Sequence, residues 1–132
     1  MIVFDANALI AVFNREQGAV VARRLLRQHR GEAWIHAVNF YEVFYGYDRD
    51  VDRAFAERIW NMMDNAGIQV CDDLDRALLR DASFIKVSHK MSLADTFAIA
   101  LARRLNCPLV STDHHELDPV HAAGVCQVIF IR

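Results

Sequence analysis

The chain has 132 residues, of which 54% are hydrophobic and 24% charged, and its formal net charge is −2. This composition excludes a disordered chain and suits one compact domain, residues 1–132, that can fold without disulfides or a structural metal. No apolar run reaches the roughly 18 residues of a membrane helix, and the N-terminus does not read as a signal peptide. We therefore expect a cytoplasmic protein with no membrane association and free thiols at its three widely spaced cysteines, Cys71, Cys107 and Cys126.

The first half of the chain alternates short apolar runs with stretches of helical periodicity. Met1–Phe4 is apolar and ends at an aspartate, as a buried strand does, and apolar residues then recur at helical spacing over Ala6–Phe13. The further elements that we expect here are a helix from Glu16 or Gln17 to about His29, a strand over Ala33–His36, an aromatic helix from Val38 to about Tyr47, and an amphipathic helix over Asp50–Asn65 that ends at Gly67.

The second half continues the alternation. Ser92 is a good N-cap residue, and Asp95 stands where a capping box places its acid. Alternating strands and helices predict an α/β fold with three layers, α/β/α, around a short, mostly parallel central sheet. The elements expected here are a strand over Ile68–Cys71, a helix from Asp73 to about Ser88 with acids in its first turn, a helix over Ser92–Leu105, and strands over Pro108–Ser111 and Gln127–Ile131.

Four scattered acids are candidates for one site. Asp5 follows the first strand and Asp113 follows Pro108–Ser111 by two residues, so both belong at the carboxyl edge of the sheet, where sites form in parallel sheets. Asp95 and Glu42 lie on helices that are otherwise largely apolar, where a lone buried charge is costly. Taken singly, the three aspartates could be helix or turn caps and Glu42 a solvent-facing residue. Together they predict a cluster.

Such a cluster needs a cation. Two unit charges ~5 Å apart repel by about 3 kcal/mol at an effective dielectric constant of ~20. Oxygen-only ligands favour Mg²⁺ or Mn²⁺ over zinc. No serine, cysteine or histidine nucleophile motif is evident, and the adjacent His114 and His115 would point apart, so we interpret them as structural. The economical mechanism is hydrolysis of a phosphodiester by metal-activated water.

At these residues the sequence resembles the PIN domain, and within that family the VapC toxins of toxin–antitoxin pairs. The resemblance spans nearly the whole chain. It is carried by the order and spacing of four segments rather than by any single one. These are Ile2–Ile10 with Asp5 and Asn7, Val38–Val43 with its Asn-x-x-Glu at Asn39 and Glu42, Ser92–Ala100 with Ser92 and Asp95, and Leu109–Asp113 with its Thr-x-Asp-like ending at Thr112 and Asp113.

The resemblance implies a PIN-like nuclease domain that binds Mg²⁺, or Mn²⁺, and cleaves single-stranded or structured-loop RNA. It also implies a homodimer and inhibition by a VapB-like protein antitoxin. Asp5, Asp95 and Asp113 would bind the metal, and Glu42 would bind it through water or orient the attacking water. The positions that would assist are Asn7, Ser92, Thr112 and Glu116, the last as a fifth acid.

Part of the aromatic helix has a second possible use. About half of its aromatic side chains are expected in the core, and the rest could line a groove for an antitoxin helix whose arginine reaches the acids. The residues concerned are Phe40, Tyr41, Phe44, Tyr45 and Tyr47.

Three other classes of protein compare with this pattern of acids. A haloacid-dehalogenase-like phosphatase needs a second acid two residues after the first, where this chain has Asn7, and a response-regulator receiver needs paired early acids and a late lysine. A catalytically silent PIN-like module that binds RNA or protein stays open. The net charge of −2 counts against RNA unless positive charge is localised. Local basic groups do occur at Arg23, Arg24, Arg27 and Arg30, at Lys86 and Lys90, and at Arg103 and Arg104.

Overall fold

The computed structural model describes all 132 residues as five strands and seven helices. All strand pairs are parallel, in the order β3-β2-β1-β4-β5. The strands are β1 (Ile2–Phe4), β2 (Ala33–His36), β3 (Ile68–Cys71), β4 (Leu109–Ser111) and β5 (Val128–Phe130). The helices are α1 (Ala6–Phe13), α2 (Ala19–Gln28), α3 (Ala37–Asp50), α4 (Arg53–Ala66), α5 (Arg76–Ser88), α6 (Leu93–Arg104) and α7 (His114–Ala122).

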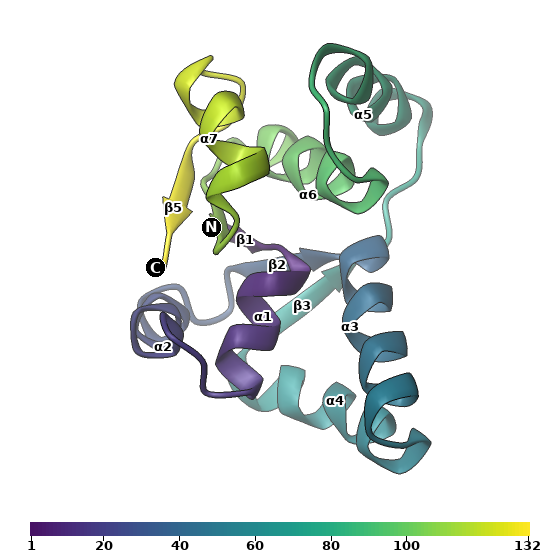
Figure 1. The fold of residues 1–132 in the computed structure, drawn as a ribbon, viewed down its shortest axis with the longest axis vertical. Coiled ribbons are helices and arrows are strands. Elements are labelled where there is room, and N and C mark those ends of the chain that lie inside the picture. Colours follow the sequence, from purple (N-terminus) through teal and green to yellow (C-terminus); the bar gives the residue numbers. More distant parts are fainter.

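Helices cover both faces of the sheet, which confirms the predicted three-layer α/β/α architecture (Figure 1). Along β1, Ile2 and Phe4 point into the core formed with α1 to α4, whereas Val3 points into the core formed with α5 to α7. This alternation follows from the period of two in a strand, and burial on both faces explains why the strands are apolar throughout. None of the helices combines the length and apolar content needed to cross a bilayer.

The central strand β1 pairs with β2 on one side and with β4 on the other. The chain therefore leaves β1 toward one half of the sheet and returns to build the other half. Such a switch point opens a crevice beyond the carboxyl ends of the two adjacent strands. The Asp5 N–H donates to the Val110 carbonyl at 3.1 Å, so the residues that follow β1 and β4 lie side by side.

Helix α7 was not predicted. Asp113 begins it as the N-cap, with its Oδ1 accepting the Glu116 N–H at 3.1 Å, so the expectation that Asp113 caps a turn is confirmed and extended to a full helix. Pro119 lies inside α7, and a proline both lacks the amide proton and clashes in a helix interior. Because Pro119 stands in a short polar stretch, the spacing of apolar residues does not predict this helix.

Other helix boundaries also differ from the predictions. Helix α2 begins at Ala19 rather than at Glu16 or Gln17, because Gly18 adopts φ 95°, a left-handed conformation that precedes the first turn. Helix α5 begins at Arg76, with Asp75 as its N-cap, so the prediction of acids inside its first turn is wrong. Helix α3 continues beyond Tyr47 to Asp50.

Candidate metal centre

Asp5 lies at the centre of the crevice and is 1% exposed. One carboxylate oxygen, Oδ1, accepts the Ala8 N–H at 2.8 Å and thereby caps α1. The interpretation of Asp5 as a helix cap is correct for this oxygen. The other oxygen, Oδ2, is buried without a hydrogen-bond partner. Burial raises the pKa of Asp5 from 3.8 to about 6, helped by the charges of Asp113 and Glu42 and opposed by the Ser111 hydroxyl and the Ala8 N–H.

Three further acids converge beside it from the helices α6 and α7. Carboxylate oxygens of Asp95, Asp113 and Glu116 all lie within 4.8 Å of one another, which is a spacing that one metal ion can bridge. Asp95 and Asp113 were predicted as members of the cluster, and Glu116 only as an assisting fifth acid. The structure gives Glu116 a central position because the first turn of α7 brings it next to Ser92 at the start of α6.

The predicted capping box at the start of α6 is only half formed. The Ser92 hydroxyl accepts the Asp95 N–H at 3.2 Å, as an N-cap should, but the Ser92 N–H donates to Glu116 Oε2 at 3.3 Å instead of to Asp95. The Asp95 carboxylate is thus left to the cluster. Burial, a hydrogen bond with Glu116 and the negative charges of Asp5 and Glu116 raise the pKa of Asp95 to about 8. The pKa of Glu116 is lowered, first by the same hydrogen bond.

Glu42 approaches the cluster from α3 on the other side of Asp5. It is half-buried, burial raises its pKa, and its charge in turn raises the pKa of Asp5. One turn earlier, Asn39 is fully buried, and its side-chain amide donates to the Ala94 carbonyl at 3.1 Å. This bond ties α3 to α6 next to Asp95, and so it fixes the two helices that carry Glu42 and Asp95.

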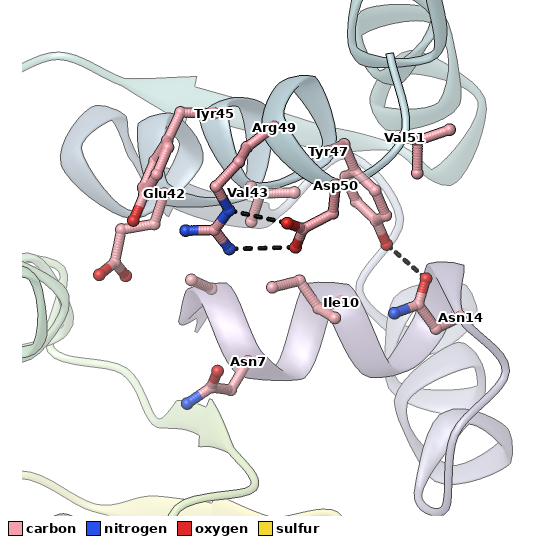
Figure 2. Close-up of a pocket in the computed structure, with 12 residues that line it drawn as sticks. Asn7, Ile10, Asn14, Glu42, Val43, Tyr45, Tyr47, Arg49, Asp50 and Val51 are labelled. Atoms are coloured by element: carbon pink, nitrogen blue, oxygen red, sulfur yellow. Dashed lines mark hydrogen bonds and ion pairs between the residues drawn. The ribbon is translucent and has the colours of Figure 1, made fainter.

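The assisting residues surround the acids unequally. Asn7 is exposed and lines two hollows, one of about 390 Å³ between α1 and α3 and one of about 260 Å³ beside Thr112 and Asp113. Figure 2 shows Glu42 and Asn7 at the same end of the first hollow, with Arg49 farther along it. Glu42 lines the first hollow and Asp113 the second, so each hollow adjoins one of the acids.

Ser111 is a residue that the sequence analysis did not single out. It is fully buried, and its hydroxyl accepts the Asp113 N–H at 3.0 Å while lowering the pKa of Asp5. One side chain therefore orients one acid and stabilises the charge of another. The only sequence signal was a serine as the last residue of an otherwise apolar strand.

His114 is structural, as predicted. Its ring stacks on Phe130 with centroids 3.9 Å apart, and its two nitrogens interact with Asp118 at 3.0 Å and with the Arg132 carbonyl at 2.8 Å. Both nitrogens thus have partners other than the five crevice acids.

The cysteines are free, one buried and two half-buried, and burial raises the pKa of each thiol.

The acids fit a hard divalent cation. All the donors are carboxylate oxygens, the Oδ2 atom of Asp5 lacks any protein partner, and none of the five acids has an arginine or lysine within ion-pairing distance. Buried like charges without a cation are unfavourable, and oxygen ligands of this kind suit Mg²⁺ or Mn²⁺. The set that would hold it comprises Asp5, Asp95, Asp113 and Glu116, with Glu42 at its edge.

Comparison with known proteins agrees with this arrangement. The sequence profile of the PIN domain matches residues 2–120. The chain belongs to the PIN domain family. No curated protein matches this PIN domain in sequence comparison.

Solved structures share the fold over nearly their whole length. A toxin–antitoxin complex from Klebsiella pneumoniae is 17% identical, with a TM-score of 0.74 over 100% of this PIN domain and 98% of that chain. A DNA-bound VapBC from Salmonella typhimurium is 12% identical, with a TM-score of 0.78 over 99% of this chain and 98% of that one. VapC20 from Mycobacterium tuberculosis, described as a toxin that cleaves the sarcin–ricin loop, is 15% identical, with a TM-score of 0.72 over 90% and 95%. At these identities the likeness establishes the fold.

Proposed function

We propose that this PIN domain is a Mg²⁺- or Mn²⁺-dependent endoribonuclease that acts in the cytoplasm as the toxin of a VapBC-type pair. The observation that carries the proposal is the convergence of Asp95, Asp113 and Glu116 within 4.8 Å, next to the orphaned Oδ2 of Asp5. The VapBC and VapC structures with the same fold support the toxin role.

The position of each acid determines whether it would bind the metal or orient water. When bound, the metal supplies an activated water and neutralises charge on the phosphodiester. Asp5, Asp95, Asp113 and Glu116 would hold it, since their oxygens lie closest together or lack a partner. Glu42, at the edge and with a raised pKa, would orient water by accepting its hydrogen bond. Asn7 stands between the two hollows and would donate to a phosphate oxygen of the RNA.

An antitoxin helix would occupy the hollow between α1 and α3. Its walls include the apolar side chains Ile10 and Val43, with Glu42 at one end, which is the pattern of a helix-in-groove site. Of the aromatic residues considered earlier, Phe40 is buried and Phe44 packs against it, whereas Tyr45 and the largely buried Tyr47 line the hollow. The aromatic groove residues are therefore Tyr45 and Tyr47, and Phe44 is one of those that pack in the core instead.

Binding of the protein encoded by the neighbouring reading frame tests the groove. Tyr45→Ala should weaken the complex about tenfold or more, as aromatic anchors of interfaces do. Phe84→Ala is the matched control, because Phe84 is 66% exposed on α5, on the opposite side of the sheet. Equal affinities for the two variants would refute the groove.

A homodimer belongs to the same proposal, and sedimentation of the protein alone tests it.

Cleavage of a mixed pool of single-stranded RNA tests the nuclease directly. Wild type and Asp95→Asn are compared with Mg²⁺, with Mn²⁺ and with EDTA. Metal-dependent cutting by the wild type alone supports the proposal. No cutting by either protein, together with binding of RNA, would instead favour a catalytically silent RNA-binding module.

A further inference from the structure

Positive charge in this protein is concentrated in one segment. Residues 17–31 contain four arginines and no acid, whereas the rest of the chain contains 11 basic and 17 acidic residues. The segment therefore carries +4 and the remainder −6, which gives the overall −2. None of these arginines forms an ion pair, although arginines elsewhere, such as Arg53 and Arg104, do.

The four arginines lie on α2 and just beyond its end. The helix buries Ala19, Ala22 and Leu26 against the core, and its exposed residues are Val20, Arg24, Arg27 and Gln28. Arg24, Arg27 and Arg30 are exposed. Arg23 is half-buried, and its guanidinium donates to the Val12 carbonyl at 3.0 Å. A hollow of about 230 Å³ between α2 and the end of α4 is lined by three of them together with Asn65.

This arginine face, defined as Arg23, Arg24, Arg27 and Arg30, begins beyond the acidic crevice and extends toward the opposite edge of the sheet, where Arg30 lies next to Gly67 at the start of β3. Val12 is seven residues after Asp5 on the same helix, a separation of about 10 Å at 1.5 Å per residue. Gly18, at the start of α2, packs so closely on the C-terminal end of the sheet that an added Cβ would lie 2.7 Å from the Ile131 carbonyl oxygen. Helix α2 thus starts near the edge of the sheet that carries the acids and runs beside α1 (Figure 1).

We propose that the arginine face of α2 is an anchoring site for the phosphate backbone of single-stranded RNA, a few nucleotides away from the bond that is cut. The inference rests on the proposed nuclease function. A crevice of carboxylates repels RNA, so affinity has to come from another surface. Arginines bind phosphates through paired N–H groups, and each phosphate contact releases counterions.

The character of the surface favours RNA over an acidic protein segment. Protein interfaces are organised around buried apolar anchors, but the arginine hollow offers no exposed aromatic side chain and its leucine, Leu26, already belongs to the core. Arg23 and Arg27 are four residues apart, about 6 Å along α2, and Arg30 lies beyond the end of the helix, which matches an extended row of phosphates better than one bound anion.

Salt-dependent binding tests the anchor. The ligand is a fluorescein-labelled 20-nucleotide single-stranded RNA, and the protein carries Asp95→Asn so that it does not cut. In this background Arg24→Gln, Arg27→Gln and Arg30→Gln are combined, while Arg23 is kept because its bond to Val12 is structural. We expect the slope of log K against log salt to fall by about 2, since each phosphate contact with a single strand contributes about 0.7.

The matched control combines Arg58→Gln, Arg76→Gln and Arg80→Gln. These three arginines are also exposed and free of ion pairs, so net charge changes equally while α2 stays intact. An equal loss of binding in both triple variants, or no loss in the α2 variant with its melting temperature unchanged, would overturn the anchor. Loss of partner-protein binding with RNA binding unchanged would assign the face to protein instead.

Cleavage kinetics separate the anchor from the nuclease. With Asp95 restored, the α2 variant should raise KM for the RNA several-fold and leave kcat nearly unchanged, because its arginines are remote from the acids. Cutting with an unaltered KM would overturn the anchor and keep the nuclease. RNA binding through α2 without any cutting by the wild type would keep the anchor and overturn the nuclease.

Discussion

Two groups of acids in this protein have opposite electrostatics. Near the ends of α5 and α6, Asp73 and Asp75 bind Arg104 at 3.0 and 2.6 Å, and the pKa of Asp75 is lowered by that arginine. In the crevice, Asp5 and Asp95 have no cationic side chain, and burial raises the pKa of both. A cluster of acids is therefore ordinary in this chain. The distinguishing property of the crevice is that its acids are partly buried and uncompensated.

Neutralising one crevice acid and one acid that has an arginine partner should give the largest contrast. Asp95→Asn should lower metal-dependent cleavage by roughly a hundredfold or more, since loss of even outer metal-site partners costs 10–100-fold. Asp81→Asn is the control: Asp81 pairs with Arg103 at 3.0 Å, so its loss should leave cleavage unchanged. Initial rates on one RNA give the comparison, and equal losses in the two variants would contradict it.

Ser111→Ala should have the next largest effect. Its hydroxyl accepts the Asp113 N–H and favours ionised Asp5, so the variant should bind metal about tenfold more weakly. Calorimetric titration with Mn²⁺ measures the change. Ser83→Ala, at an exposed serine of α5 far from the acids, serves as the control. A Ser111→Ala variant with wild-type affinity would show that Ser111 does not position the acids.

The stability of the metal-free protein should depend on pH with opposite sign for the two groups, because the pKa values are raised in the crevice and that of Asp75 is lowered. The pKa values of Asp5 and Asp95 rise from 3.8 to about 6 and about 8. The folded protein thus holds these protons more tightly than the unfolded chain, and the resulting stability is complete below about pH 4 and lost as pH rises toward 8. In EDTA, the melting temperature of Asp95→Asn should increasingly exceed that of wild type from pH 5 to 8.5. A constant difference would contradict the raised pKa.

The smallest effect is expected at the compensated acids. Arg104→Gln removes ion pairs with Asp73 and Asp75, which are largely exposed and screened by solvent, so we expect only a small loss of stability. Denaturant unfolding measures it. Metal affinity should not change, because Arg104 does not touch the crevice acids. A weaker metal site in this variant would mean that the two groups are coupled.

The sequence predicted the crevice where the signal was local. Asp5 directly follows an apolar strand, and Ser92 marks the start of α6 three residues before Asp95, so both acids could be placed from neighbouring residues alone. The position of Glu116 could not be predicted from neighbouring residues. Its position depends on α7, whose helical pattern is interrupted by Pro119.

Long-range pairing explains the other errors. Asp73 and Asp75 looked like acids of a helical first turn, but Asp75 is the N-cap of α5, and both acids bind Arg104, about thirty residues later. Nothing in the local sequence separates them from the crevice acids. The same holds for α2, whose arginines could be noted in the sequence but whose lack of acidic partners is known only from the fold.

The most direct test of the account is binding of Mn²⁺, followed by the loss of the electron paramagnetic resonance signal of the free ion. It needs no RNA and no partner protein. We predict saturable binding by wild type and by Asp81→Asn, and binding weakened at least tenfold in Asp95→Asn. Equal binding by all three proteins, or none by wild type, would contradict the claim that the uncompensated acids of the crevice form a metal site.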